Sequence, residues 1–130
     1  MLVIDSSIAI PAVASDRGFA FLGRDPLVAP PILWSEVRSA LHEAVWRGEL
    51  SAAGALVSLQ ELDGGAVTAR THRRLGITAW NLATEFGWAK TYDAEFVALA
   101  TLLDCRMVTR DSRLIRGAAR LGLVVAPEDL

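Results

Sequence analysis

Cysteine is nearly absent from this 130-residue chain. The one cysteine, Cys105, excludes an internal disulfide and any zinc site built from several cysteines. We expect it to be a small buried side chain in a reducing cytoplasm. The two histidines, His42 and His72, have no partner at the spacing of metal ligands, so ordinary surface or core roles are expected for both.

Long apolar runs and an excess of one charge are also missing. No run reaches the roughly 18 apolar residues that span a membrane, and Asp5 interrupts the first run before it could form a secretory signal. We therefore expect no membrane partner. The net charge of −2 gives no basic signature for nucleic acid, although two bound divalent cations would reverse its sign. Lys90 is the only lysine beside twelve arginines, whose planar groups suit phosphate.

Apolar residues, in contrast, make up 52% of the chain. This content is typical of a parallel sheet that is buried on both faces. Short apolar segments alternate with helical patterns, which predicts one α/β domain over residues 1–130. The expected strands are 2–4, 27–29, 66–69, 106–109 and 123–126. The expected helices are 32–48, 51–62, 72–86, 91–103 and 111–121, with a first helix that starts or kinks near Pro11 because proline lacks a donor.

Four acidic residues stand where expected strands end or helices begin: Asp5, Glu36, Asp93 and Asp111. Each one alone can be explained as a helix cap or as a partner of the helix dipole. In a parallel sheet, however, all four lie along the edge outside the carboxyl ends of the strands. Two unit charges about 4 Å apart repel by roughly 4 kcal/mol at an effective dielectric near 20. A divalent cation would offset this repulsion, and oxygen ligands alone suit Mg²⁺ or Mn²⁺.

Four segments in order carry a family resemblance: V-I-D-S-S, L-V-A-P-P-I-L-W-S-E-V, T-Y-D-A-E-F-V-A-L-A and M-V-T-R-D-S-R-L. With them the chain resembles the PIN-domain nucleases, most closely the VapC-type toxins of bacterial toxin–antitoxin pairs. The resemblance implies a three-layer α/β/α fold with about five strands. It also implies that Asp5, Glu36, Asp93 and Asp111 form the acidic quartet of the family. Ser7 and Thr109 match positions that support the site. Pro11 and the short segment after it depart from the pattern.

The resemblance further implies a metal-dependent endoribonuclease with an RNA substrate, a cognate antitoxin and a homodimeric state. Asp5, Asp93 and Asp111 would be nearest the Mg²⁺ or Mn²⁺, and Glu36 would act directly or through water. Trp34 and Trp46 could line an antitoxin groove, and residues 72–103 could form the dimer interface.

Four arginines flank or follow Asp111: Arg110, Arg113, Arg116 and Arg120. The last three are spaced three and four apart, which predicts a stripe on one helix. A solvated helix face explains this stripe most simply. Contact with RNA phosphates or with an acidic partner segment is the functional alternative.

Other functions remain open. A PIN nuclease of RNA maturation would share the site, and a non-catalytic interaction module could bind a cation in the acidic pocket without cleaving RNA. A phosphoacceptor receiver domain has the same size and architecture. It requires a lysine after a late strand, whereas Lys90 precedes a helix.

Overall fold

The computed structural model describes all 130 residues and contains one parallel sheet of five strands. The strands are β1 (Leu2–Ile4), β2 (Leu27–Ala29), β3 (Thr68–Ala69), β4 (Arg106–Val108) and β5 (Val124–Val125). Their order across the sheet is β3-β2-β1-β4-β5, and every neighbouring pair is parallel. The predicted parallel α/β fold is confirmed.

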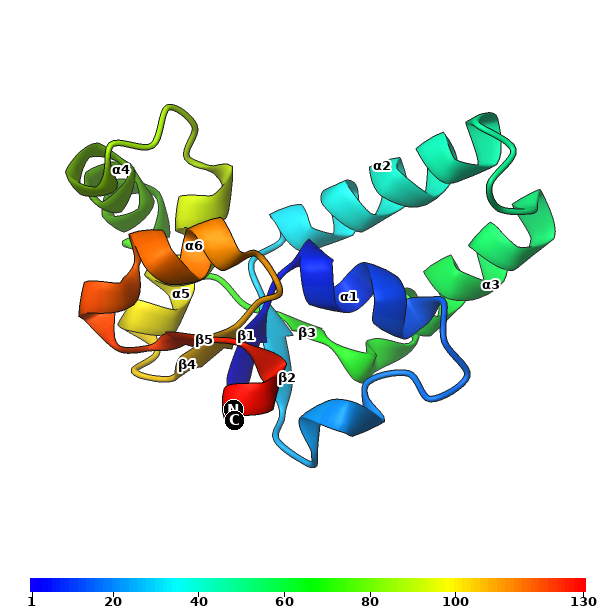
Figure 1. The fold of residues 1–130 in the computed structure, drawn as a ribbon, viewed down its shortest axis with the longest axis horizontal. Helices are drawn as coiled ribbons and strands as arrows, with labels where there is room; N and C mark the ends of the chain where they lie inside the picture. The colour runs from blue at the N-terminus through cyan, green and yellow to red at the C-terminus, as the bar shows by residue number, and fades with distance from the viewer.

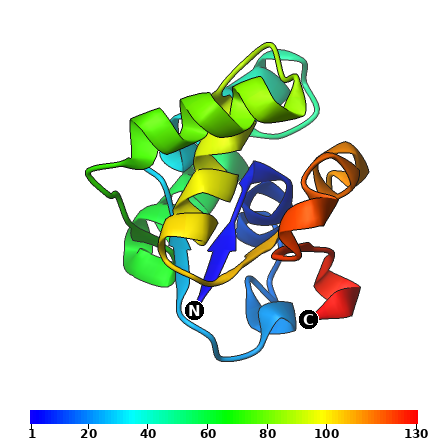
Figure 2. The same cartoon turned by 90° about the vertical axis from the view of Figure 1, so that its left-hand side faces the viewer.

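Six α-helices surround this sheet: α1 (Ser6–Val13), α2 (Ile32–Trp46), α3 (Ala52–Glu61), α4 (Leu75–Phe86), α5 (Tyr92–Leu102) and α6 (Ser112–Gly117). Helices α1 and α6 cover one face, whereas α5 covers the other and carries α4 on its outer side (Figure 2). Helices α2 and α3 form a hairpin that extends away from the sheet (Figure 1). None of the helices is both long and apolar enough to cross a membrane.

The core follows from the two most apolar segments of the chain. All three residues of β1 are buried, and so is the run from Phe96 to Ala100 in α5. A helix that is apolar all round is typical of one packed between two layers, and α5 lies between the sheet and α4. Gly87 ends α4 with φ of +71°, a left-handed conformation that glycine adopts without strain. The turn sends the chain back toward the start of α5.

Three expected boundaries were wrong. Helix α1 begins at Ser6 and continues through Pro11, because Asp5 caps it and one missing hydrogen bond is tolerated in a short helix. Helix α4 begins at Leu75, since Nδ1 of His72 accepts the Arg74 N–H at 3.0 Å and holds a turn there. Helix α6 ends at Gly117 and is followed by a separate 3-10 turn over Ala119–Leu121.

The sheet register determines which loops meet. Ile4 of β1 pairs with Val108 of β4, so Asp5 and Thr109 leave the sheet side by side. Strand β1 has β2 on one side and β4 on the other, and the chain crosses from one side to the other between β3 and β4. Such a reversal of strand order opens a crevice at the carboxyl edge, where open α/β sheets bind their ligands.

Candidate functional site

Asp5 lies at the centre of this edge and is only 7% exposed. Its Oδ1 accepts the Ser7 hydroxyl at 2.5 Å and the Ile8 N–H at 3.3 Å, and its Oδ2 accepts the Thr109 hydroxyl at 2.5 Å. Burial raises the pKa of Asp5 more than these hydrogen bonds lower it, and the charge of Asp93 raises it further. Asp5 is therefore a buried carboxylate with no positively charged partner in the chain.

Ser7 and Thr109 join the two turns that carry the acidic residues. Their hydroxyl oxygens are 3.2 Å apart, and Thr109 is completely buried. The Ser7 hydroxyl accepts the Arg110 N–H at 2.9 Å, and the Thr109 hydroxyl accepts the Asp111 N–H at 3.0 Å. The two hydroxyls thus fix the carboxylate of Asp5 and the backbone that leads to Asp111.

Glu36 reaches the same edge from the start of α2. Its Oε2 accepts the Ser6 hydroxyl at 2.9 Å, while its Oε1 is buried and has no hydrogen-bond partner. Burial raises the pKa of Glu36, and the negative charges of Asp93, Asp5 and Glu95 add to the effect. An unpaired buried oxygen is costly, which makes Oε1 a position where a ligand would be stabilised.

Asp93 lies in the first turn of α5, and its charge interacts with those of the other candidate carboxylates. Partial burial of its carboxylate raises its pKa, and the charge of Asp111 raises it further against the opposing charge of Arg113. Its own charge acts on Asp5 and on Glu36. Asp93 therefore links the predicted carboxylates, because its charge acts on Asp5 and Glu36 and the charge of Asp111 acts on Asp93.

Asp111 differs from the other three carboxylates because it already pairs with a positively charged side chain, that of Arg113. It caps α6 by accepting the Arg113 N–H at 2.9 Å, and its Oδ2 lies 3.0 Å from Nη2 of Arg113. The hydrogen bonds from Arg113 hold the pKa of Asp111 below its usual range. In this conformation both carboxylate oxygens of Asp111 are directed to Arg113.

The donor set fits a hard divalent cation. All the converging groups are carboxylate oxygens, which Mg²⁺ and Mn²⁺ prefer, and Glu36 keeps one buried oxygen free. No three of these side chains gather closely enough in this conformation to hold one ion together. Asp111 is paired with Arg113 in this conformation.

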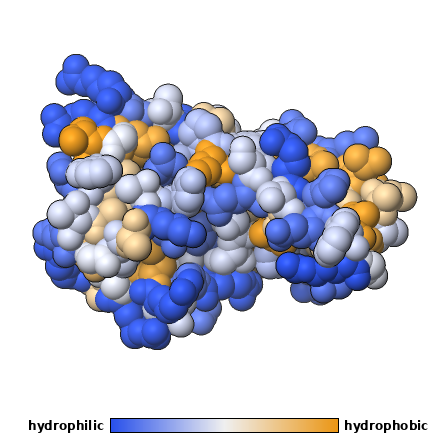
Figure 3. Space-filling view, turned by 90° about the horizontal axis from the view of Figure 1, so that it is seen from above, coloured by the Kyte–Doolittle hydropathy of each residue, from blue (hydrophilic) through white to orange (hydrophobic).

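Two adjoining cavities open at the acidic edge. One, of about 430 Å³, lies between α2 and the start of α5 and is lined in part by Glu36, Lys90 and Asp93. The other, of about 350 Å³, is lined in part by Lys90, Asp93 and Asp111. Figure 3 views the molecule from above Figure 1, and hydrophilic residues, drawn in blue, cover much of this face. Lys90 and Asp93 contribute to both cavities.

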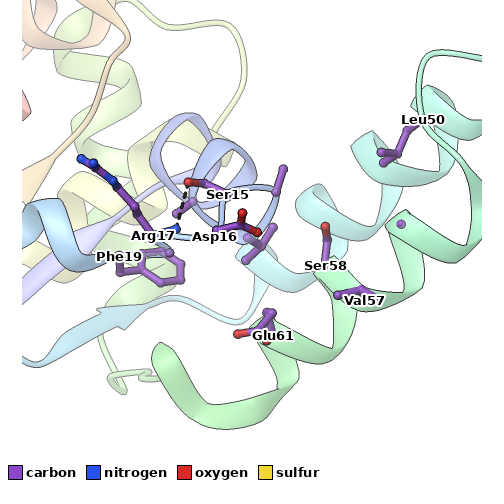
Figure 4. A pocket seen from close by; sticks show the side chains of 13 residues that line it. Ser15, Asp16, Arg17, Phe19, Leu50, Val57, Ser58 and Glu61 are labelled. Atoms are coloured by element: carbon purple, nitrogen blue, oxygen red, sulfur yellow. Dashed lines mark hydrogen bonds between the residues drawn. The ribbon is translucent and has the colours of Figure 1, made fainter.

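The largest cavity is elsewhere and contains none of the four carboxylates. It measures about 650 Å³ and lies between residues 12–19 and α3. Figure 4 shows Ser15, Asp16 and Phe19 on one side of it, with Val57, Ser58 and Glu61 of α3 on the other. Its lining shares no residue with the two cavities at the acidic edge, which separates it from the candidate site.

Sequence reasoning missed three residues at the site. Ser6 positions Glu36, Glu95 adds charge to it, and Lys90 lies between the two cavities. Ser6 stands beside Asp5 in the D-S-S segment, and Glu95 is two residues after Asp93, so proximity to the quartet was the only available signal.

The expected stripe on one helix was wrong for Arg120, because α6 ends at Gly117, whereas the expected solvent exposure of Arg113, Arg116 and Arg120 is confirmed. Arg113 is paired with Asp111, and Arg120 lies beyond the end of α6, where it pairs with Glu85 and covers the ring of Phe86 at 5.0 Å. Arg116 is exposed, and the guanidinium of Arg110 lies over the ring of Phe21 at 5.5 Å. The four arginines therefore have four different surroundings instead of one common face.

Comparisons with known proteins show the family of this chain. The sequence model of the PIN domain matches residues 2–120, and the chain belongs to the PIN-domain family. Within that family it is similar to VapC-type proteins. It is 33% identical over 136 residues to "VapC ribonuclease Mb0985" of Mycobacterium bovis, which covers 98% of this chain and 99% of that protein. "Ribonuclease VapC9" of Mycobacterium tuberculosis matches to the same extent, and "Ribonuclease VapC1" of that species is 35% identical over 118 residues, 86% of each chain.

A solved structure agrees on the fold. The crystal structure of PAE2754 from Pyrobaculum aerophilum superposes with a TM-score of 0.79 over 98% of this chain and 91% of that one. At 20% identity this likeness concerns the fold alone. The resemblance to VapC-type PIN domains and the α/β/α architecture are both confirmed.

Proposed function

We propose that this protein is an Mg²⁺- or Mn²⁺-dependent endoribonuclease that acts as the toxin of a toxin–antitoxin pair. The observation that carries the proposal is the buried Asp5 at the switch point of the sheet, which has no positively charged partner and whose charge acts on Glu36, a residue with an unpaired buried Oε1. The ribonuclease names of the VapC relatives supply the substrate class.

The family resemblance suggests the roles of the acidic residues, and the contacts of the hydroxyl groups suggest theirs. Asp5, Asp93 and Asp111 would hold the cation, with Glu36 acting directly or through water, so the quartet is both the metal site and the catalytic site. When bound, the ion polarises the phosphodiester and lowers the pKa of a water molecule. Ser7 and Thr109 keep the carboxylate of Asp5 in one orientation, and Ser6 directs Glu36.

Positive side chains at the rim would hold the RNA backbone. Arg110, Arg113 and Arg116 are all exposed near the start of α6 or along it. Release of Arg113 from Asp111 on cation binding would free its guanidinium for an RNA phosphate.

Exposed hydrophobic residues support the proposed contacts with an antitoxin and with a second copy of the chain. Trp46 at the end of α2 is 83% exposed, whereas Trp34 packs partly against the core, so Trp46 is the better candidate for antitoxin contact. Ile77 and Trp80 on α4 are 54% and 64% exposed. They lie within residues 72–103, the proposed homodimer interface.

Purified protein incubated with total RNA tests the activity. We expect cleavage with Mg²⁺ or Mn²⁺, none with EDTA, and none for Glu36→Gln. Glu43→Gln is the matched control, because Glu43 lies on the same helix and is exposed. Cleavage that persists in EDTA would contradict the metal-dependent mechanism, and cation binding without cleavage would favour an interaction module. Expression that leaves growth unaffected, with cleavage intact, would favour RNA maturation.

A further inference from the structure

Two kinds of side chain line the smaller cavity at the acidic edge. Asp93 and Asp111 line one part of it, and Trp88 and Lys90 line another part. Its volume of about 350 Å³ falls within the range of small-ligand sites. An aromatic side chain, a positively charged side chain and two candidate metal ligands thus line the same cavity.

Trp88 is held in a fixed position in this cavity. Its ring centroid lies 4.9 Å from that of Phe86 with the planes tilted by 45°. Gly117 of α6 lies against the other part of the indole, where an added Cβ would be only 3.1 Å from Cζ2 and 3.3 Å from Nε1. The absence of a side chain at position 117 therefore allows the indole to lie against α6, beside Asp111.

Lys90 is the cation that remains free at this place. It forms no ion pair, whereas Arg113 in the same cavity is paired with Asp111. Lys90 also lines the adjoining cavity with Glu36, so its ammonium can reach the space on both sides of Asp93.

We propose that the Trp88–Lys90 cavity is the subsite for the nucleotide next to the cleaved bond, with the base stacked on Trp88 and its phosphate bound by Lys90. The inference rests on the proposed ribonuclease function and names the part of the substrate that this cavity takes. Stacking on an aromatic face accepts any base, and a single lysine binds phosphate as a point charge. This subsite therefore contributes affinity and position to single-stranded RNA, with little base preference.

Binding of a fluorescently labelled single-stranded oligoribonucleotide, measured by anisotropy with Ca²⁺ in place of Mg²⁺, tests the subsite. We expect Trp88→Leu to weaken binding roughly 5- to 100-fold, as for other base–aromatic contacts, and Trp88→Phe to stay within about 3-fold of wild type. Trp46→Leu is the matched control, because Trp46 is an exposed tryptophan at the far end of α2 and no antitoxin is present in the assay. Its affinity should equal that of wild type.

Two further variants separate the subsite from a loss of folding. Gly117→Ala removes no chemical group, but the indole must shift by a few tenths of an ångström to admit the Cβ, so binding should fall in part while the melting temperature stays close to wild type. Lys90→Met should reduce the slope of log affinity against log salt by about 0.7, as expected for one lost phosphate contact on single-stranded nucleic acid. Arg47→Met, at the end of the α2 hairpin, should leave the slope unchanged.

The outcomes distinguish a failure of the proposed ribonuclease function from a failure of the nucleotide subsite alone. If wild type neither binds nor cleaves RNA, the proposed function fails and the subsite fails with it. If wild type binds and cleaves, but Trp88→Leu, Gly117→Ala and Lys90→Met all bind as wild type does, the subsite alone is overturned.

Discussion

Asp5 and Asp111 occupy equivalent places in two neighbouring units of the fold. Each follows a central strand, β1 or β4, and each caps the helix that comes next. Asp5 is buried among hydroxyl groups and its pKa is raised, whereas Asp111 pairs with Arg113 and its pKa is lowered. The same local motif therefore gives one carboxylate that lacks a counter-ion and one that carries its own.

This difference indicates that the two aspartates would bind a divalent cation in different ways. Asp5 cannot exchange partners without losing two short hydrogen bonds, so it forms the fixed side of the site. Asp111 can exchange Arg113 for another cation at little cost, because the arginine side chain is 81% exposed and exposed ion pairs contribute only about 0–1 kcal/mol. We infer a fixed ligand on β1 and an exchangeable ligand on β4.

The comparison predicts opposite stability changes for two matched substitutions. In the metal-free protein, Asp5→Asn removes a buried unpaired charge, so the melting temperature should rise by a few degrees. Asp111→Asn keeps the cap but loses the ion pair, so the melting temperature should fall slightly or stay unchanged. RNA cleavage should fall at least roughly 100-fold in both, since each removes a proposed ligand of the ion.

Melting curves in EDTA and a cleavage assay on the same preparations measure these changes. Equal stability shifts of the same sign in both variants would show that the two aspartates do not differ in the proposed way.

Thr109→Val should have the next largest effect on stability and cation affinity. Valine keeps the shape but leaves Oδ2 of Asp5 and the N–H of Asp111 without the hydroxyl, which should lower the free energy of unfolding by about 1–3 kcal/mol. Cation affinity should fall roughly 10- to 100-fold, as for other groups that orient metal ligands. Thr101→Val is the control, because the Thr101 hydroxyl bonds only the Val97 carbonyl of its own helix. Denaturant unfolding and Mn²⁺ titration of both variants would be compared, and equal behaviour would refute the role of Thr109.

The pH dependence should follow the raised pKa values. Asp5, Glu36 and Asp93 bind protons more tightly in the folded chain than in the unfolded chain. The free energy of unfolding of the metal-free protein should therefore rise as the pH falls from about 7 toward the ordinary carboxyl range near 4. Asp111 acts in the opposite direction, but only below about pH 4, because its stabilising contribution is lost as the pH falls through its lowered pKa.

Stabilisation by Mg²⁺ should shrink over the same range, since protons and the cation compete for the same oxygens. Melting temperatures across this pH range, with and without Mg²⁺, would show both trends. Asp5→Asn should respond less to pH in the absence of metal. A Mg²⁺-induced shift that does not change with pH would exclude these carboxylates as its ligands.

Arg113→Ala should have the smallest effect and the opposite sign. Removing the arginine frees Asp111 and removes a positive charge near the cation, so Mn²⁺ affinity should increase roughly 2- to 5-fold. Arg116→Ala, one turn further along α6, controls for the change in net charge. Calorimetric titration would detect the difference, and an affinity that falls in Arg113→Ala would mean that the arginine supports the site instead of competing for it.

The sequence allowed the sheet and the four carboxylates to be predicted because both depend on local patterns. Apolar strands followed by Asp5 or Asp111, and helices opening with Glu36 or Asp93, require no knowledge of distant contacts. The direction of each pKa shift could not be predicted in this way. The hydroxyl of Thr109 reaches Asp5 across 104 residues, and only the β1–β4 register shows that they meet.

Other errors had equally specific causes. The propensity of proline to break helices was outweighed at Pro11 by the cap of Asp5 and the short length of α1. The arginine spacing that predicts a stripe assumes a continuous helix, whereas the chain turns after Gly117. The role of Gly117 itself depends on Trp88, which lies 29 residues away in the sequence and packs against it in the fold.

The central claim is that the acidic edge binds a divalent cation between a fixed Asp5 and an exchangeable Asp111. The most direct test is a crystal grown with Mn²⁺ and measured near its absorption edge, so that anomalous scattering locates the ion. We predict a peak about 2.0–2.4 Å from carboxylate oxygens of Asp5 and Asp93, with Asp111 turned away from Arg113. An anomalous map without a peak at this edge, with the Asp111–Arg113 pair intact at a Mn²⁺ concentration that supports RNA cleavage, would contradict the account.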